Sequence, residues 1–146
     1  MTTLTDVVTA ARTWIGTPYQ HQQRIKGVAV DCAGLVIGVA RELNLVTENF
    51  DITGYSPVPD GTSLVLNCED YMTEVPKQNM RPGHIIVVKF DSEPQHFGIL
   101  SDYIHGRLAI IHATSRYMKV IETRLLFSES PSGMKFVSAY CLPGVA

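Results

Sequence analysis

The sequence is short of cysteine, of excess charge and of long apolar runs, and each shortage excludes a class of protein. Its three cysteines are scattered and form no C-x-x-C pair, which argues against a disulfide framework and a cysteine-rich zinc site. A net charge of −2 gives no basic footprint for nucleic acid. No apolar run approaches the ~18 residues of a membrane span, so we expect no membrane insertion. The N-terminus has neither the basic nor the apolar region of a signal peptide.

What the sequence does contain is the composition of an ordinary soluble globular protein, with 45% hydrophobic and 18% charged residues. Its 146 residues predict a single domain over residues 1–146. A chain of that length buries enough surface to be stable without disulfides or metals.

The first half of the chain predicts helices. Apolar residues recur at helical spacing over residues 4–15, where Thr3 or Thr5 can cap the start. The same spacing recurs over residues 64–75 and predicts another amphipathic helix. Cys68 falls on the apolar face of that helix, so we expect it to be a small buried side chain.

Residues 32–43 have a helical pattern that is nearly apolar all round, which is typical of a helix inside the core. Gly34 and Gly38 each lower its helix propensity by ~1 kcal/mol relative to alanine. We therefore expect a neighbouring backbone to pack closely against this helix. Residues 47–61 are punctuated by glycine and proline and are predicted to be a loop.

The second half of the chain predicts strands. Short β-branched runs separated by turn residues indicate an antiparallel meander. The predicted strands are 85–90, which should be buried on both faces, 96–100, 108–113, 118–121 and 135–141. Helices followed by strands predict an α+β fold.

Cys32 stands at the predicted start of the apolar helix, directly after Asp31, which is suited to cap it. The N-terminus of a helix exposes unpaired N–H groups and carries a partial positive charge, which stabilises a thiolate. Cys32 is therefore a candidate nucleophile. A cysteine in an apolar stretch is more often a buried structural thiol, and this alternative stays open from the pattern alone.

A nucleophilic cysteine needs a base, and a third group that orients the base. His96 begins a predicted strand on the same face as Gly98, which would leave that face open for the cysteine-bearing helix. His112 ends a strand that can pair with the first. The two histidines can thus lie side by side, with His96 as base and His112 fixing its tautomer.

The other polar residues of the chain have simpler interpretations. His84 and His105 are expected to be ordinary polar residues that meet solvent, and the role of His21 stays open. A metal site made of Cys32, His96 and His112 would match no common ligand spacing, and we predict no metal or cofactor. The polar residues ahead of the cysteine are most simply a solvated connector: Gln20, Gln22, Gln23 and Arg24.

Five motifs in order resemble those of the NlpC/P60 cysteine peptidases. Residues 31–36 resemble the signature D-C-(S/A)-G-(L/V)-(V/I), and residues 81–85 resemble the P-G-D motif at which a strand of that family begins. Residues 96–99 resemble the H-(V/F)-G-(I/L) strand, and residues 111–113 resemble the motif of the third catalytic residue. Tyr19 lies where that family has a tyrosine ahead of the cysteine.

The resemblance implies a circularly permuted papain-like fold, with N-terminal helices packed on an antiparallel sheet. It implies hydrolysis of peptidoglycan stem-peptide bonds next to D-glutamate or diaminopimelate. In that mechanism Cys32 is the nucleophile, His96 the base and His112 the residue that orients the base. The Tyr19 hydroxyl would contribute to the oxyanion hole or substrate cleft, and Asp31 would cap the helix and border the substrate site.

Two positions depart from the family pattern. Ala33, in the substrate-binding motif, replaces the serine that many members have, so the bond that is cleaved becomes harder to infer. His84 replaces the usual aspartate at the start of its strand, and we predict a structural role for it.

The runs 11–19, 26–27 and 41–43 are similar to the short single-domain NlpC/P60 proteins of tailed phages and gene transfer agents. That similarity implies a virion protein at the tail tip that is made in the host cytoplasm and opens the cell wall as DNA enters. Its partners would be peptidoglycan stem peptides and proteins of the tail tip or hub. The alternatives are a structural tail-tip plug or assembly protein, and a related cysteine amidase or acyltransferase.

Overall fold

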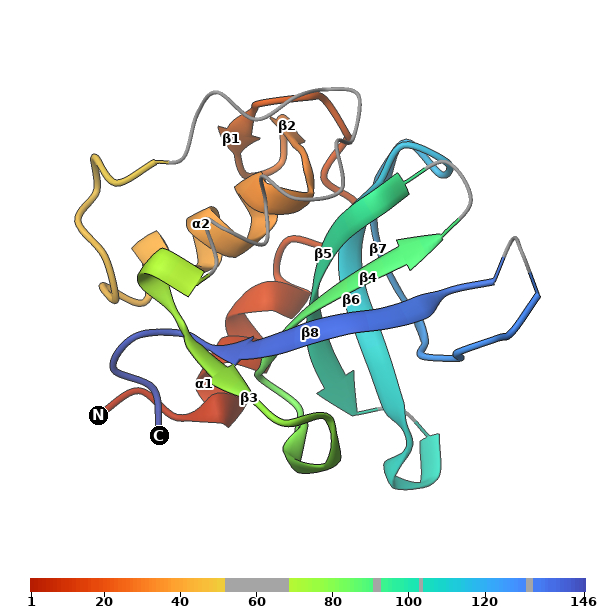
Figure 1. The fold of residues 1–146 in the computed structure, drawn as a ribbon. Helices are drawn as coiled ribbons and strands as arrows, with labels where there is room; N and C mark the ends of the chain where they lie inside the picture. Colours follow the sequence, from red (N-terminus) through yellow and green to blue (C-terminus); the bar gives the residue numbers. More distant parts are fainter. Residues whose placement is uncertain (52–68, 91–92, 103, 131–132) are drawn as a thin grey trace.

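The computed structural model describes residues 1–51, 69–90, 93–102, 104–130 and 133–146. Its N-terminal part contains α1 (Leu4–Arg12), the short strands β1 (Arg24–Ile25) and β2 (Ala29–Val30), and α2 (Cys32–Glu42). The antiparallel ribbon β1–β2 comes directly before α2. Figure 1 shows these elements packed beside a sheet that is built from the later part of the chain. The predicted α+β arrangement is confirmed.

The start of α1 is fixed by a capping box between Thr3 and Asp6. The N–H of Asp6 donates to Thr3 Oγ1 at 3.1 Å, and the N–H of Thr3 donates to Asp6 Oδ2 at 2.9 Å. The helix ends at Arg12, earlier than the predicted 4–15, because its last turn tightens. There the N–H groups bond three residues back instead of four, and the Thr13 hydroxyl donates to the carbonyl of Ala10 at 2.6 Å.

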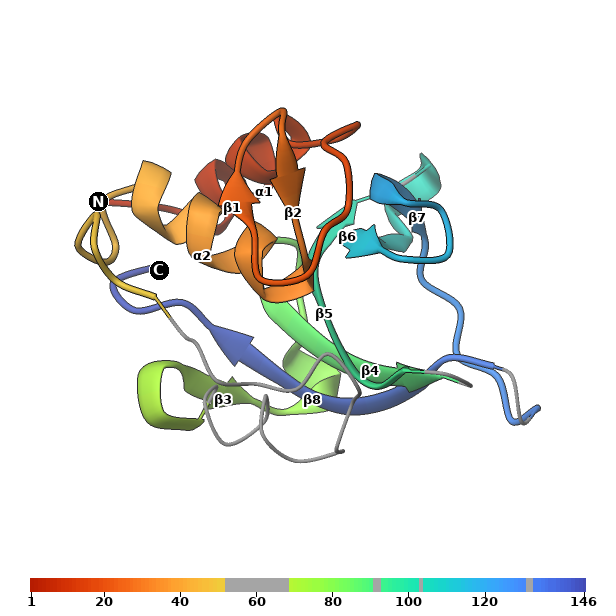
Figure 2. The same ribbon diagram turned by 90° about the horizontal axis from the view of Figure 1, so that it is seen from above.

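Six of the described strands form one sheet in the order β3-β8-β4-β5-β6-β7, with antiparallel neighbours throughout. They are β3 (Thr73–Val75), β4 (Ile85–Phe90), β5 (Glu93–Asp102), β6 (Leu108–Thr114), β7 (Lys119–Arg124) and β8 (Lys135–Cys141), with 3-10 turns η1 (Lys77–Asn79) and η2 (Ile104–Gly106). Figure 2 shows α1 and α2 on the same side of this curved sheet.

The predicted meander is right for β4 to β7 and wrong for β8. Instead of lying next to β7, β8 returns across the sheet to pair with β4. The physical reason lies in β4, whose residues Ile85 to Val88 are fully buried. A strand buried on both faces needs a hydrogen-bonded neighbour on each side, and β5 and β8 supply the two.

The predicted helix over 64–75 is wrong at its end. Residues 69–71 are helical, but Thr73–Val75 form β3 and pair with β8, with Thr73 opposite Cys141. The edge of β8 offers backbone partners to this short segment, and that tertiary ladder overrides the helical spacing. Residues 64–68 lie outside the described part of the chain, so the prediction for Cys68 stays a prediction. The same applies to residues 52–61 of the predicted loop.

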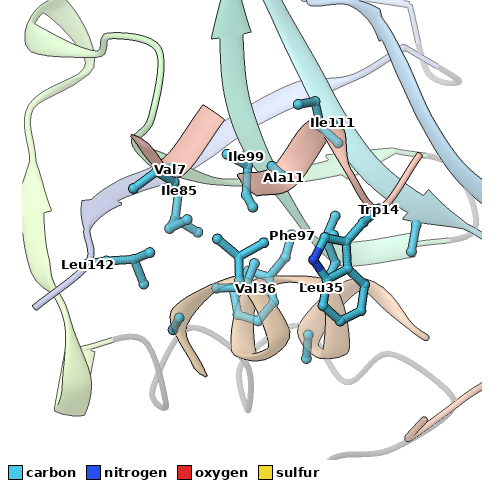
Figure 3. Close-up of a cluster of buried hydrophobic side chains, with 14 of the residues drawn as sticks. Val7, Ala11, Trp14, Leu35, Val36, Ile85, Phe97, Ile99, Ile111 and Leu142 are labelled. Atoms are coloured by element: carbon cyan, nitrogen blue, oxygen red, sulfur yellow. The ribbon is translucent and has the colours of Figure 1, made fainter. Parts of the chain in front are cut away.

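The main core lies between α1, α2 and one face of the sheet, as Figure 3 shows. Eight consecutive residues of α2, from Ala33 to Ala40, are buried, which confirms the interior helix. Trp14 packs on this helix so tightly that a Cβ on Gly38 would lie 2.2 Å from its ring. The close neighbour at Gly38 is therefore an indole ring and not the backbone that we predicted.

A second apolar cluster covers the opposite face of the sheet. It contains Ile86, Val88, Leu100 and Ile110, with Phe136 packed against it. Alternate residues of β4 thus enter the two clusters, as expected for a strand buried on both faces. Within the described ranges, the helices are too short or too polar to cross a membrane.

Candidate active site

Cys32 is the first residue of α2, and Asp31 caps the helix, as predicted. The backbone N–H of Gly34 donates to Asp31 Oδ1 at 2.7 Å. Cys32 is half-buried against the main core, so its thiol is neither enclosed nor fully exposed. A half-buried thiol at a capped helix N-terminus has the setting expected of a nucleophile.

The Asp31 carboxylate is held on several sides. It accepts from the N–H of Gln22 at 2.7 Å and from Arg24 Nη1 at 2.9 Å, and His21 Nδ1 lies 3.7 Å from it. Its side chain is only 2% exposed, and that of Arg24 only 9%. Arg24 also donates to Asp51, which follows the helix, at 2.8 Å.

The prediction that Arg24 belongs to a solvated connector is therefore wrong. A buried carboxylate needs a cationic or hydrogen-bonding partner, because its unpaired charge is very costly inside a protein. Because a buried Asp31 needs such a partner, its burial would have indicated a pairing with the nearby basic residue Arg24. Gln20 and Gln22 have exposed side chains, as expected for a connector.

The close backbone approach that we predicted occurs at Gly34. A Cβ at this position would lie 2.2 Å from the carbonyl oxygen of Gln23. That oxygen accepts from Arg24 Nη1 at 3.1 Å and from the N–H of Asp31 at 3.4 Å. The glycine therefore lets the loop ahead of the cysteine lie directly on the start of α2.

Residues 17–20 connect the start of α2 to the sheet. The N–H of Tyr19 donates to the carbonyl of Met118, in the turn between β6 and β7, at 2.9 Å. The N–H of Gln20 donates to the carbonyl of Val30, and the N–H of Val30 donates to that of Pro18, both at 2.9 Å. Tyr19 itself is half-buried against the main core. Because Val30 lies two residues before Cys32, these bonds hold the helix start near the end of β6.

His96 and His112 lie on adjacent strands, β5 and β6, near that same end. His96 Nε2 is 2.7 Å from His112 Nδ1, and the ring centroids are 5.0 Å apart. Both side chains are buried, and His112 Nε2 lies 3.3 Å from the hydroxyl of Thr123 on β7. The prediction that the two histidines lie side by side is confirmed. Figures 1 and 2 show the N-terminal end of α2 directed toward β5 and β6.

Gly98 does not have the role that we predicted. A Cβ there would lie 2.3 Å from Ile110 Cγ1, so the space beside this glycine is filled by a side chain of the neighbouring strand. Because strand residues alternate, Phe97 and Ile99 face the helices, and Gly98 lies on the side of the second cluster. His96 shares that side with Gly98, as predicted, but it is not the face of the sheet that α2 covers. The glycine therefore makes room within the sheet and not for α2.

The remaining histidines differ from one another. His105 is exposed in η2, as predicted. His84 is buried, contrary to prediction, and its Nδ1 accepts from the N–H of Arg81 at 3.1 Å. Burial, followed by the positive charge of Arg81, lowers the pKa of His84. Among the described residues, no group of metal-binding side chains converges on one point.

Ala33 is 1% exposed and lines an apolar pocket with Val36, Ile37 and Phe97. The structure thus places this residue against the core, directly behind Cys32. The substrate-binding role of position 33 stays a prediction.

No protein-family model matches the chain, and no curated protein matches it. Among solved structures, an N-acetylmuramoyl-L-alanine amidase from Bacteroides uniformis is similar with a TM-score of 0.59 at 14% identity, over 96% of this chain and 98% of that one. NlpC2 from Trichomonas vaginalis gives 0.61 at 20% identity, over 94% of this chain and 46% of that one. The NlpC/p60 domain of the peptidoglycan hydrolase SagA gives 0.52 at 20% identity, over 92% and 97%.

The chain has the NlpC/P60 fold. It spans about half the length of the NlpC2 structure and almost the whole of the other two. All of these identities lie at or below 20%, so the likeness establishes the architecture, and the chemistry must be argued from the site.

Proposed function

We propose that this chain is a cysteine peptidase of the NlpC/P60 type that hydrolyses amide bonds in peptidoglycan stem peptides. The observation that carries the proposal is the buried hydrogen bond between His96 and His112, 2.7 Å long. It lies near the end of the sheet to which residues 17–20 tie the start of the Cys32 helix. A thiol, a base and an orienting group are the parts that nucleophilic catalysis needs.

The proposed reaction follows from the ring atoms. The His96–His112 bond uses Nε2 of His96, so Nδ1 is the atom that takes the Cys32 proton as Sγ attacks the amide carbonyl. His96 then gives that proton to the leaving amine, which leaves a thioester on Cys32. Water, deprotonated by His96, hydrolyses the thioester to a carboxylic acid and restores the thiol.

The tetrahedral intermediate needs hydrogen-bond donors for its oxyanion. We assign this role to the backbone N–H of Cys32, at the N-terminus of α2, and to the hydroxyl of Tyr19. Each donor aimed at the developing charge contributes about 3–4 kcal/mol to transition-state stabilisation. The hydrogen bonds of residues 17–20 to Val30 support the placement of Tyr19 beside the cysteine.

The substrate class is supported by the motifs at residues 31–36 and 96–99 and by the SagA domain, which is described as part of a peptidoglycan hydrolase. The endopeptidase reaction next to D-glutamate or diaminopimelate is our first candidate. An amidase reaction at the bond between muramic acid and L-alanine is the second. It is favoured by the likeness to the Bacteroides uniformis amidase over almost the full length of both chains.

We further propose that the enzyme acts from a phage tail tip or hub, where it opens the cell wall during DNA entry. The support is the similarity of residues 11–19, 26–27 and 41–43 to short proteins of tailed phages and gene transfer agents. Detection of the chain in purified particles, at the tail tip, tests this setting separately from the chemistry.

Digestion of purified muropeptides, followed by mass spectrometry of the products, tests the reaction. The wild-type protein should release fragments cut at one stem-peptide bond, and Cys32→Ala should release none while keeping its circular dichroism spectrum. Cleavage between D-glutamate and diaminopimelate identifies the endopeptidase, and cleavage at the lactyl–L-alanine bond identifies the amidase. Activity that persists in Cys32→Ala would overturn the nucleophile assignment.

A further inference from the structure

A hydrogen-bonded chain continues beyond the two histidines to a threonine on a third strand. His96 Nε2 lies 2.7 Å from His112 Nδ1, and His112 Nε2 lies 3.3 Å from Thr123 Oγ1. We propose that Thr123 is a positioning residue whose hydroxyl oxygen accepts from the Nε2–H tautomer of His112. The proposal rests on the proposed function only for the role of His96 as base.

The sheet register places Thr123 for this contact. In the ladder between β6 and β7, His112 is opposite Ile121 and Ile110 is opposite Thr123. Thr123 is therefore the diagonal neighbour of His112, and it lies on the same face of the sheet. Diagonal neighbours are within reach of side chains as long as an imidazole ring.

The proton positions follow from the role of His96. When His96 has taken the Cys32 proton on Nδ1, both of its ring nitrogens carry hydrogen, and Nε2–H must find an acceptor. His112 Nδ1 can accept only if the His112 proton is on Nε2. The Nε2–H group then points at Thr123 Oγ1, which accepts it. His112 and Thr123 neither gain nor lose a proton during the reaction.

The surroundings show why a fixed acceptor matters. His112 and Thr123 line an open cleft of about 250 Å³, together with Thr114, Arg116 and Tyr117. Water that enters such a cleft can donate to Nε2 as readily as it accepts, and donation favours the opposite tautomer of His112. In that tautomer Nδ1 carries the hydrogen, so it cannot accept from protonated His96. A hydroxyl held on β7 keeps an oxygen at a fixed place beside Nε2, and the hydrogen bond from His96 to His112 Nδ1 requires this oxygen to accept.

A threonine hydroxyl can also donate, so the experiment must read the tautomer directly. Nitrogen-15 NMR of the imidazole rings in the resting wild-type protein distinguishes a protonated from an unprotonated ring nitrogen. We expect His112 to carry its proton on Nε2 in the wild type and to show a mixture of tautomers in Thr123→Val. Protonation of His112 on Nδ1 in the wild type overturns the proposal, whatever the enzyme cleaves.

Kinetics with muropeptides supply the second readout. Thr123→Val, which keeps the shape of the side chain, should lower kcat about 5- to 10-fold with KM unchanged, as expected for one lost hydrogen bond. Thr123→Ser should restore the rate. The matched control is Thr13→Val, because the Thr13 hydroxyl donates to the carbonyl of Ala10 at 2.6 Å and does not line this cleft. Its kcat should stay at the wild-type value.

The outcomes separate this proposal from the proposed function. If the wild-type protein cleaves muropeptides and Thr123→Val cleaves them at the same rate, the role of Thr123 is wrong and the hydrolase assignment stands. If the wild-type protein does not cleave muropeptides, the hydrolase assignment is wrong, and the NMR result alone decides the tautomer of His112.

Discussion

At the scale of single residues, His84 shows how the interior of this sheet changes a titratable group. It is 5% exposed at the start of β4, where the family that the sequence resembles has an aspartate. Its Nδ1 accepts from the N–H of Arg81, and burial is the largest cause of its lowered pKa. The folded protein therefore favours the neutral ring.

This preference predicts a dependence of stability on pH. Because the pKa of His84 is lower in the folded state than its ordinary value of 6.5, the unfolded chain binds the proton more tightly. The free energy of unfolding should be unaffected well above pH 6.5. It should decrease as the pH falls through 6.5 and level off below the folded pKa.

His84→Asn tests this prediction, because an amide oxygen can accept from Arg81 but does not titrate. Urea denaturation at pH 7.5 and at pH 5 should show a smaller loss of stability in the variant than in the wild type. An equal loss in both proteins would contradict a role for His84.

At the scale of elements, the start of α2 depends on an ion pair between two loop residues. Arg24 Nη1 lies 2.9 Å from Asp31 Oδ1, and both side chains are nearly buried. Breaking a buried ion pair from one side leaves an uncompensated charge, which costs about 3–5 kcal/mol. The cap of α2 should therefore be among the most sensitive points of the fold.

Arg24→Met should lower the free energy of unfolding by about 3–5 kcal/mol and should reduce muropeptide cleavage, because Asp31 loses its cationic partner. Arg12→Met is the matched control. Arg12 pairs with Asp102 and Glu122, but its side chain is 41% exposed, so its loss should cost less than about 1 kcal/mol. Similar losses in urea denaturation for the two variants would contradict this account.

Local sequence patterns predicted which helices and strands form better than they predicted which strands pair with one another. The apolar stretch of α2 and the β-branched run of β4 could be predicted from composition alone, because burial determines their composition. The return of β8 to β4 and the formation of β3 were missed, because both depend on pairing between distant segments. Such pairing leaves no signal in a short window of sequence.

At the scale of the whole molecule, the candidate site joins a helix from the first third of the chain to strands from the second half. The sequence predicted Cys32, His96 and His112 from residue type and motif. It did not predict the hydrogen bonds of residues 17–20 that tie the helix to the sheet. Nor did it predict the ion pair between Arg24 and Asp31, or the contact between His112 and Thr123. Those contacts arise only when distant segments meet.

The rate of Cys32 alkylation by iodoacetamide, mapped by peptide mass spectrometry from pH 5 to 9, tests the central claim most directly. It needs no substrate, and Cys141, whose pKa is raised by burial, serves as an internal reference. We predict that His96→Ala slows the alkylation of Cys32 across this range and leaves that of Cys141 unchanged, because thiolate is the reactive form and His96 accepts the Cys32 proton. Equal rates of Cys32 alkylation in the wild type and in His96→Ala would contradict a Cys32–His96 pair.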